Sequence, residues 1–236
     1  ILRDAYVKLP DYKGHTCGRS KFTFCYNLGY QWGGGVAGGM EMTNICLKDN
    51  FGIEVDYNVE ISFDSFIKMI DYIDGIDIEL TQAEADYLNK DTLYVKRTIE
   101  PGVQRLQGME ALSYARMRKA AGDSESDIKR TARQRKVVEA LLEKFRHRSI
   151  ADLNKWIDIL LPMVTTTMTP TDVTKLAAKV LPMFSELKIS GNTVPMEGWG
   201  DMVDVDKDGQ PDSVMLFDTA KEKKLIRAIT EAEVSE

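Results

Sequence analysis

Cysteine and histidine are scarce in this chain. Only three cysteines and two histidines occur among its 236 residues. The spacing of Cys17, Cys25 and Cys46 matches no zinc-binding pattern, and His15 and His147 stand alone, so no zinc site is indicated. Cys17 and Cys25 flank a short segment that a disulfide would close in an extracytoplasmic protein. Three free thiols, buried or half-buried, are the alternative.

Long hydrophobic runs are also missing. No stretch of about 18 apolar residues occurs, so the sequence predicts no membrane-spanning helix. The chain opens on Ile1-Leu2-Arg3-Asp4, which does not resemble a signal peptide. We interpret Ile1 and Leu2 as the end of a strand, so the chain is expected to be part of a longer protein.

The chain has no excess of positive charge. It contains 31 Lys and Arg against 37 Asp and Glu, a formal net charge of -6. An acidic chain without interleaved basic and aromatic residues is not typical of nucleic-acid binding, so no nucleic-acid partner is expected. No Gly-Lys-Ser/Thr follows the glycines at 33–35, which excludes a phosphate-binding P-loop.

One acidic segment resembles the beginning of a calcium-binding loop. Asp204, Asp206 and Asp208 precede Gly209, and Asp212 also fits that pattern. The twelfth position, however, lacks the glutamate that chelates calcium through both of its oxygens. An acidic turn between two strands is therefore the favoured interpretation, with a calcium site as the alternative.

Against this acidic background, basic residues cluster in one short window. Four arginines and a glutamine fall within nineteen residues, namely Arg116, Arg118, Arg130, Arg133 and Gln134. Guanidinium groups hold phosphate or carboxylate oxygens in a fixed fork, so a convergent set indicates a bound polyanion. For any one of these arginines, a solvated helix face or an ion pair is the alternative.

Apolar periodicity predicts strands and helices in alternation. The expected strands are 5–9, 55–63, 76–80, 187–189, 193–196 and 214–217, and the expected helices are 40–50, 66–73, 108–117, 127–147, 150–161, 171–184 and 219–232. The glycine-rich segment 13–39 predicts a long functional loop. The strand–helix–strand order over 55–80 predicts an α/β fold with helices packed on a sheet.

The motifs together resemble the LytR-CpsA-Psr family of bacterial cell-wall glycopolymer ligases. The matching stretches are 2–7, 21–26, 50–53, 74–77, 106–118 and 127–134, and the resemblance covers about 1–148. It implies a central mixed β-sheet flanked by α-helices. It also implies a catalytic domain over 1–148 that is N-terminally incomplete. A helical and short-strand extension over 149–236 is expected to pack on that domain.

The resemblance further implies an extracytoplasmic phosphotransferase. Such an enzyme takes an anionic glycopolymer, of teichoic acid or capsule type, from a polyprenyl-pyrophosphate carrier and attaches it to a peptidoglycan hydroxyl with the help of Mg²⁺. The full-length protein is then expected at the outer face of the bacterial membrane, held by a single-pass anchor that this chain does not contain. The alternative is a non-catalytic module or regulator that binds polyprenyl phosphate or an anionic polymer.

Six positions match functional residues of the family. The resemblance assigns catalytic roles to Arg3, Arg116 and Arg118 and substrate-binding roles to Lys21, Arg130 and Gln134. The family's magnesium-binding aspartates precede the arginine that matches Arg3, in a segment that this chain lacks. Asp4 is the acidic residue that remains, either as part of a metal site or as an orienting partner of Arg3. The metal ligands are therefore unknown.

These matches predict the shape of the site. We expect the arginines and Gln134 to converge on one cleft with Arg3. Beside it we expect a hydrophobic tunnel lined by the helices over 63–73 and 137–145, because an isoprenoid tail needs a dry channel. The apolar run 160–163 is instead interpreted as core.

Overall fold

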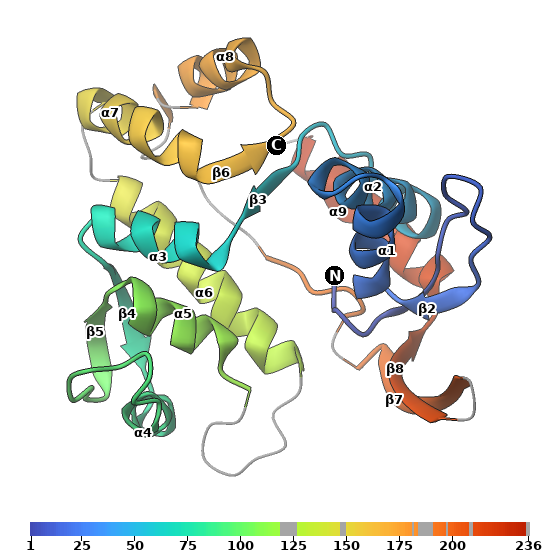
Figure 1. Cartoon of the computed structure of the whole chain (residues 1–236), viewed down its shortest axis with the longest axis horizontal. Helices are drawn as coiled ribbons and strands as arrows, with labels where there is room; N and C mark the ends of the chain where they lie inside the picture. The colour runs from blue at the N-terminus through green and yellow to red at the C-terminus, as the bar shows by residue number, and fades with distance from the viewer. Residues whose placement is uncertain are drawn as a thin grey trace. The chain divides into compact units, whose positions relative to one another are not determined.

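The chain forms two compact units (Figure 1). The computed structural model describes residues 1–118, 127–146, 150–180, 182–183, 191–196, 198–207 and 210–234. The terminal unit comprises 1–56 and 192–236, and the central unit comprises 57–191. The C-terminal segment thus packs with the N-terminal one, whereas the expected division placed the boundary at residue 148. That division into a catalytic domain and an extension stays a prediction.

The described residues form four small antiparallel sheets, each of two strands, and the predicted central mixed sheet is wrong for this part of the chain. The pairs are β1 (Tyr6–Lys8) with β2 (Arg19–Lys21), β3 (Val59–Ile61) with β6 (Val164–Thr166), β4 (Ile76–Leu80) with β5 (Gly102–Leu106), and β7 (Gly200–Lys207) with β8 (Gln210–Phe217). The strands expected over 55–63 and 76–80 are present in part as β3 and β4, but each pairs with a different, later strand. The architecture remains mixed α/β.

Two helices of the terminal unit pack very closely. They are α1 (Thr23–Trp32) and α2 (Val36–Phe51). A Cβ atom on Gly38 would collide with the carbonyl oxygen of Gly29, so the close approach depends on the missing side chains. The expected loop over 13–39 is therefore wrong over much of its length. Glycine weakens helical propensity, and the pattern did not show that these glycines serve helix packing.

The β7–β8 hairpin lies beside β1. The amide of Met215 donates to the carbonyl oxygen of Asp4 at 2.8 Å. In the hairpin, Val205 pairs with Asp212, so the acidic segment joins two strands as the favoured interpretation predicted. The predicted calcium loop includes residues 208 and 209, which lie outside the described residues. After the hairpin, α9 (Thr219–Val234) packs on α2.

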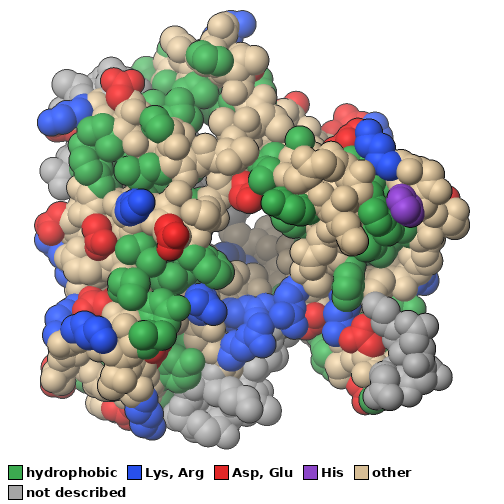
Figure 2. Space-filling model, in the orientation of Figure 1, with side chains coloured by type: hydrophobic (Ala, Val, Ile, Leu, Met, Phe, Trp, Pro, Cys, Tyr) green, Lys and Arg blue, Asp and Glu red, His purple; other side chains and the backbone are tan. Residues whose placement is uncertain are grey.

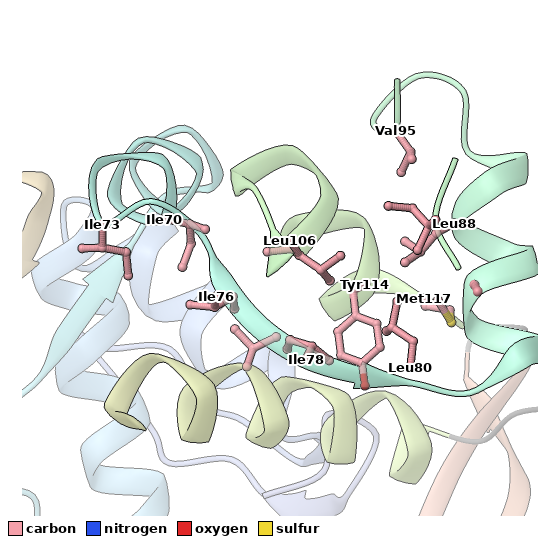
Figure 3. Packing of buried hydrophobic residues seen from close by; sticks show 14 of the residues in the cluster. Ile70, Ile73, Ile76, Ile78, Leu80, Leu88, Val95, Leu106, Tyr114 and Met117 are labelled. Atoms are coloured by element: carbon pink, nitrogen blue, oxygen red, sulfur yellow. The ribbon is translucent and has the colours of Figure 1, made fainter. Parts of the chain in front are cut away.

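The core of the central unit lies around β4 (Figure 3). Ile76, Ile78 and Leu80 are buried, whereas Asp77 and Glu79 are exposed, as alternation along a half-buried strand requires. Helices that contribute to this core include α3 (Phe63–Tyr72), α5 (Gly108–Arg116) and α6 (Asp127–Arg146). Of the predicted site residues, Arg116 lies on α5, and Arg130 and Gln134 lie on α6.

The remaining elements show where local patterns succeeded. The predicted helices at 108–117, 150–161 and 219–232 are confirmed by α5, α7 and α9. The other elements of the central unit are α4 (Gln82–Lys90), α7 (Ile150–Leu160), the short 3₁₀ turn η1 (Leu161–Met163) and α8 (Pro170–Val180). The strand predicted at 193–196 is wrong, and the one at 187–189 lies outside the described residues. α4 and β5 were not predicted.

Candidate functional site

Arg116 and Arg118 lie at the C-terminal end of α5. The helix begins with a capping box, in which the Gln107 amide donates to the Glu110 carboxylate at 3.0 Å, and it ends at Arg116. Met117 is the C-cap residue, with φ -54° and ψ 124°, and its side chain is fully buried. Arg116 and Arg118, on either side of this buried residue, are both exposed.

Two aromatic rings hold the Arg116 side chain. Its guanidinium carbon lies 4.9 Å from the ring centroid of Phe63 and 6.0 Å from that of Tyr94. Nη1 of Arg116 also donates to the Tyr94 hydroxyl at 3.3 Å. Phe63 is the first residue of α3, and its side chain is 59% exposed. These contacts restrain the exposed Arg116 side chain, and none of them is to a carboxylate.

Arg133 has a different environment from the other arginines of the basic window. Its Nε donates to Glu84 Oε1 at 2.9 Å, and its Nη1 donates to the Met117 carbonyl oxygen at 3.3 Å. Arg133 and Glu84 are each only 6% exposed. The pair joins α4, the end of α5 and α6. For Arg133, therefore, the ion-pair alternative of the sequence analysis is confirmed.

The Glu84 carboxylate also accepts from the Thr81 amide at 3.0 Å. Burial acts to raise the pKa of Glu84, but the hydrogen bonds from Thr81 and Arg133 outweigh it and lower that pKa below its usual range. A depressed folded-state pKa contributes stability that is present above the unfolded-state pKa. That stability is lost as the pH falls through the folded-state pKa.

The lowered pKa of Glu84 predicts that its ion pair with Arg133 is sensitive to acid. We expect the free energy of unfolding of the wild type to fall as the pH is lowered below about 4.3, the usual pKa of a glutamate. The Glu84→Gln variant should be less stable at neutral pH and should lose less stability over the same acid range. Denaturant titrations at pH 7, 5, 4 and 3 measure both effects. Parallel pH profiles for the two proteins would contradict the assignment.

Gln134, which follows Arg133 on α6, contacts the end of α5. Nε2 of Gln134 lies 3.5 Å from the carbonyl oxygen of Ala115, beside Arg116. Arg130 precedes Gln134 by four residues, so both lie on the same face of α6. The central unit therefore places the end of α5, with Arg116 and Arg118, against this turn of α6. Figure 2 shows basic side chains gathered on the face where α5 ends and α6 begins.

Arg3 and Lys21 belong to the terminal unit and share one ion network. Arg3 donates twice to Asp4, from Nε to Oδ1 and from Nη2 to Oδ2, both at 3.1 Å. Lys21 Nζ lies 2.5 Å from Asp212 Oδ1 and 3.9 Å from Asp4 Oδ1. Asp4 thus orients Arg3, and the contribution of Asp212 was not predicted. The expected convergence of Arg3 with the arginines of the central unit stays a prediction.

Magnesium ligands are not evident in the part of the chain that the structure describes. There, no group of three or more histidine, cysteine, aspartate or glutamate side chains is arranged to hold a metal ion. Asp4 is the nearest candidate from the sequence, but cationic groups already contact both of its oxygens. The donor set of these residues does not fit the expected Mg²⁺.

The central unit also contains an apolar cavity of about 400 Å³. Its lining residues are Met69, Leu142, Phe145, Ile157, Leu160, Leu161, Val164, Met168, Val173, Leu176, Ala177 and Val180. Met69 on α3 and two α6 residues confirm that these helices line an apolar space. Sequence reasoning missed the contribution of α7 and α8. It interpreted 160–163 as core, which is confirmed for Leu160, although Leu160 and Leu161 also line the cavity. Leu161 and Leu176 are 36% and 43% exposed, so the cavity is open to solvent at these residues.

The cysteines form no disulfide. All three are free, as the thiol alternative predicted, and Cys25 on α1 and Cys46 on α2 are fully buried. In the same described part of the chain, no helix is long and apolar enough to cross a membrane.

The comparison with known proteins gives a family for this arrangement. The sequence profile of the LytR-CpsA-Psr family matches residues 1–224. The chain is 32% identical over 161 residues to the Bacillus subtilis polyisoprenyl-teichoic acid–peptidoglycan teichoic acid transferase TagT, covering 68% of this chain and 44% of TagT. It is 29% identical over 212 residues to the Staphylococcus aureus regulatory protein MsrR, covering 89% of this chain and 57% of MsrR. The chain thus spans about half the length of these relatives.

Solved structures share the fold. One is the LytR-CPS2A-psr family protein YwtF (TagT) with bound octaprenyl pyrophosphate lipid. It aligns with a TM-score of 0.63 at 22% identity and covers 100% of this chain and 77% of that one. At this identity the likeness establishes the architecture alone.

Proposed function

Because the chain belongs to the LytR-CpsA-Psr family, we propose that it is an extracytoplasmic phosphotransferase that attaches lipid-linked anionic glycopolymers to peptidoglycan. The substrate is a glycopolymer, of teichoic acid or capsule type, on a polyprenyl-pyrophosphate carrier. Such a carrier needs two features within reach of each other: cationic donors for the pyrophosphate and an apolar cavity for the tail.

One observation supports this proposal above the others: α3 connects these two features. Phe63 at its first position contacts Arg116, and Met69 lines the cavity. Six residues of helix correspond to about 9 Å along the axis. In α6, Gln134 and Leu142 are separated by eight residues, or about 12 Å. Phe63, which contacts Arg116, and Gln134 therefore lie on the same two helices as residues that line the apolar cavity, which supports the proposal.

The arginines supply electrostatic stabilisation in this reaction. An acceptor hydroxyl oxygen forms a bond to the phosphorus that bears the glycopolymer, the pyrophosphate bridge breaks, and polyprenyl phosphate leaves with the bonding electrons. Negative charge then grows on the leaving phosphate. Guanidinium groups already held in place, such as Arg116, stabilise that charge with little reorganisation. The hydroxyl proton passes to a base, a role that we assign to no side chain.

Magnesium remains an expectation from the family. Because the described carboxylates do not fit the ion, we derive no step through it.

The decisive experiment measures transfer directly. Purified protein is mixed with a polyprenyl-pyrophosphate-linked oligosaccharide and a peptidoglycan fragment, and mass spectrometry detects the phosphodiester-linked product and released polyprenyl phosphate. Transfer supports the enzyme. Tight binding of the carrier without transfer, under conditions that support a related transferase, would contradict it. That outcome would favour the alternative of a non-catalytic binding module, a role in keeping with the regulatory name of MsrR.

Arg118 gives a test at the level of one side chain. We expect Arg118→Ala to weaken binding of octaprenyl pyrophosphate by roughly ten- to a hundredfold, because a charge-assisted hydrogen bond contributes about 1.5–3 kcal/mol. Arg118→Lys should retain part of the affinity, since the charge remains but the planar fork is lost. Isothermal titration in detergent measures all three proteins.

Arg105 provides the matched control. It is also exposed and lies in the same unit, but its guanidinium is paired with Asp77 and Asp74 on β4 and the turn before it. Arg105→Ala should therefore bind the lipid as the wild type does. Equal affinity of wild type, Arg118→Ala and Arg118→Lys would show that Arg118 only faces solvent.

A further inference from the structure

Arg116 is an unusual exposed arginine, because two rings restrain it. Long arginine side chains lose about 2 kcal/mol of rotamer entropy when they are immobilised. A guanidinium that is already restrained loses less of this freedom on binding an anion. The Phe63 ring, 4.9 Å from the guanidinium carbon, and the Tyr94 ring, at 6.0 Å, supply this restraint without a competing negative charge.

The kind of contact matters as much as its presence. A carboxylate partner would neutralise Arg116 and compete with a phosphate for its N–H donors. A ring attracts the cation through the negative potential of its face and requires no N–H donor. The Tyr94 hydroxyl accepts one hydrogen bond from Nη1 at 3.3 Å, and a guanidinium has five donors in all. Most donors of Arg116 are thus not committed to these two residues.

The position of Phe63 is otherwise hard to explain. Its side chain is 59% exposed although it begins a helix whose later residues Met69 and Ile70 are buried. Ser62 caps that helix by accepting a hydrogen bond from the Ser65 amide at 3.1 Å. The cap sets where α3 begins and so places Phe63 next to Arg116. The core does not require an aromatic side chain at this exposed position.

We propose that Phe63 and Tyr94 are positioning residues that clamp the Arg116 guanidinium in the orientation that receives the substrate pyrophosphate. The inference rests on the proposed function, because it assigns the clamp to that same site. It extends the site to two aromatic residues on α3 and on the segment after α4. Neither residue needs to touch the phosphates.

The test compares side-chain shape with ring chemistry. Octaprenyl pyrophosphate is titrated into wild type, Phe63→Leu, Phe63→Trp and Tyr94→Phe. A cation–π contact at an exposed site contributes about 0.5–1 kcal/mol, so Phe63→Leu should weaken affinity about two- to fivefold. Phe63→Trp keeps a ring and should restore affinity. Tyr94→Phe keeps the ring but loses the hydroxyl, and a smaller loss of about twofold is expected.

A second readout observes the clamp without ligand. The Nε–H resonance of Arg116, assigned by its loss in Arg116→Ala, should shift in Phe63→Leu because the ring current disappears. Val103→Ala is the control: Val103 is 70% exposed in the same unit, and its truncation should change neither the resonance nor the affinity. If Phe63 acted only by stabilising the fold, the affinity and the Arg116 resonance would not depend on the presence of a ring at position 63.

The outcomes separate this inference from the proposed function. Failure of the wild type to bind the lipid would overturn both. Binding that depends on Arg116 but is unchanged in Phe63→Leu would overturn the clamp alone. An unchanged Arg116 resonance in Phe63→Leu would also overturn it. Loss in Phe63→Leu with recovery in Phe63→Trp, in a chain whose denaturation midpoint is unchanged, supports the clamp.

Discussion

Replacing Arg133 with alanine is expected to lower the free energy of unfolding by about 3–5 kcal/mol, because breaking a buried ion pair leaves an uncompensated charge. Arg133 and Glu84 are both only 6% exposed, so little water reaches the carboxylate that remains. The Met117 carbonyl oxygen loses a donor in the same change. Chemical denaturation followed by circular dichroism measures the effect.

Two comparisons make this expectation specific. Glu139→Ala changes an exposed residue of the same helix and should alter stability by no more than about 0.5 kcal/mol. Replacing Glu84 and Arg133 together by apolar residues of similar size should recover much of the loss, since no buried charge is then left unpaired. If Arg133→Ala and Glu139→Ala had the same denaturation midpoint, the pair would contribute nothing to stability.

Filling the apolar cavity is expected to have the largest effect on ligand binding. Ala177 on α8 lines the cavity, and a tryptophan at this position would occupy the space available to a lipid tail. Each buried methylene contributes about 0.8 kcal/mol, so excluding about four of them should weaken octaprenyl pyrophosphate binding by about a hundredfold or more. Inorganic pyrophosphate lacks a tail, and its affinity should not change.

The neighbouring residue gives a matched control. Ala178 is exposed on the same helix and does not line the cavity, so Ala178→Trp should bind the lipid as the wild type does. Titration of both ligands into both variants separates the tail site from the headgroup site. Equal lipid affinity in Ala177→Trp and the wild type would show that the tail lies elsewhere. Equal losses for lipid and pyrophosphate would point to a general distortion of the unit.

Local patterns predicted the helices better than the sheets. The helix predicted over 108–117 depends on residues within that segment, and the structure confirms it as α5. The central sheet was implied by the family resemblance, but β3 pairs with Val164–Thr166, about a hundred residues later in the chain. Which strand a segment pairs with depends on distant residues, and alternation along one segment does not report them.

The glycine-rich segment 13–39 is a second case in which the local sequence pattern did not report a distant contact. Its composition predicts a loop, because glycine disfavours helices. Gly29 and Gly38 instead let α1 and α2 approach until no Cβ would fit between them. Asp212 is a further example. Its sequence context indicated an acidic turn, with a calcium loop as the alternative, and neither predicted that its carboxylate lies against Lys21.

In the candidate site, too, the sequence predicted local relations between residues but not their distant contacts. The amino-acid sequence by itself determined that Arg116 and Arg118 flank an apolar residue at the end of a helix, and that Arg130 and Gln134 share a helical face. These are relations between residues no more than four positions apart, which backbone geometry fixes directly. The sequence also placed Arg133 in the basic window, but it did not distinguish Arg133 from the other arginines there.

Only the tertiary structure decided what each of these residues contacts. Arg133 pairs with Glu84, 49 positions earlier, and is buried, whereas Arg116 lies exposed between Phe63 and Tyr94. The cavity likewise combines α3 and α6 with helices more distant in the chain. Burial and charge pairing depend on which segments meet when the chain folds, and for these residues that outcome separates a structural arginine from one available to a ligand.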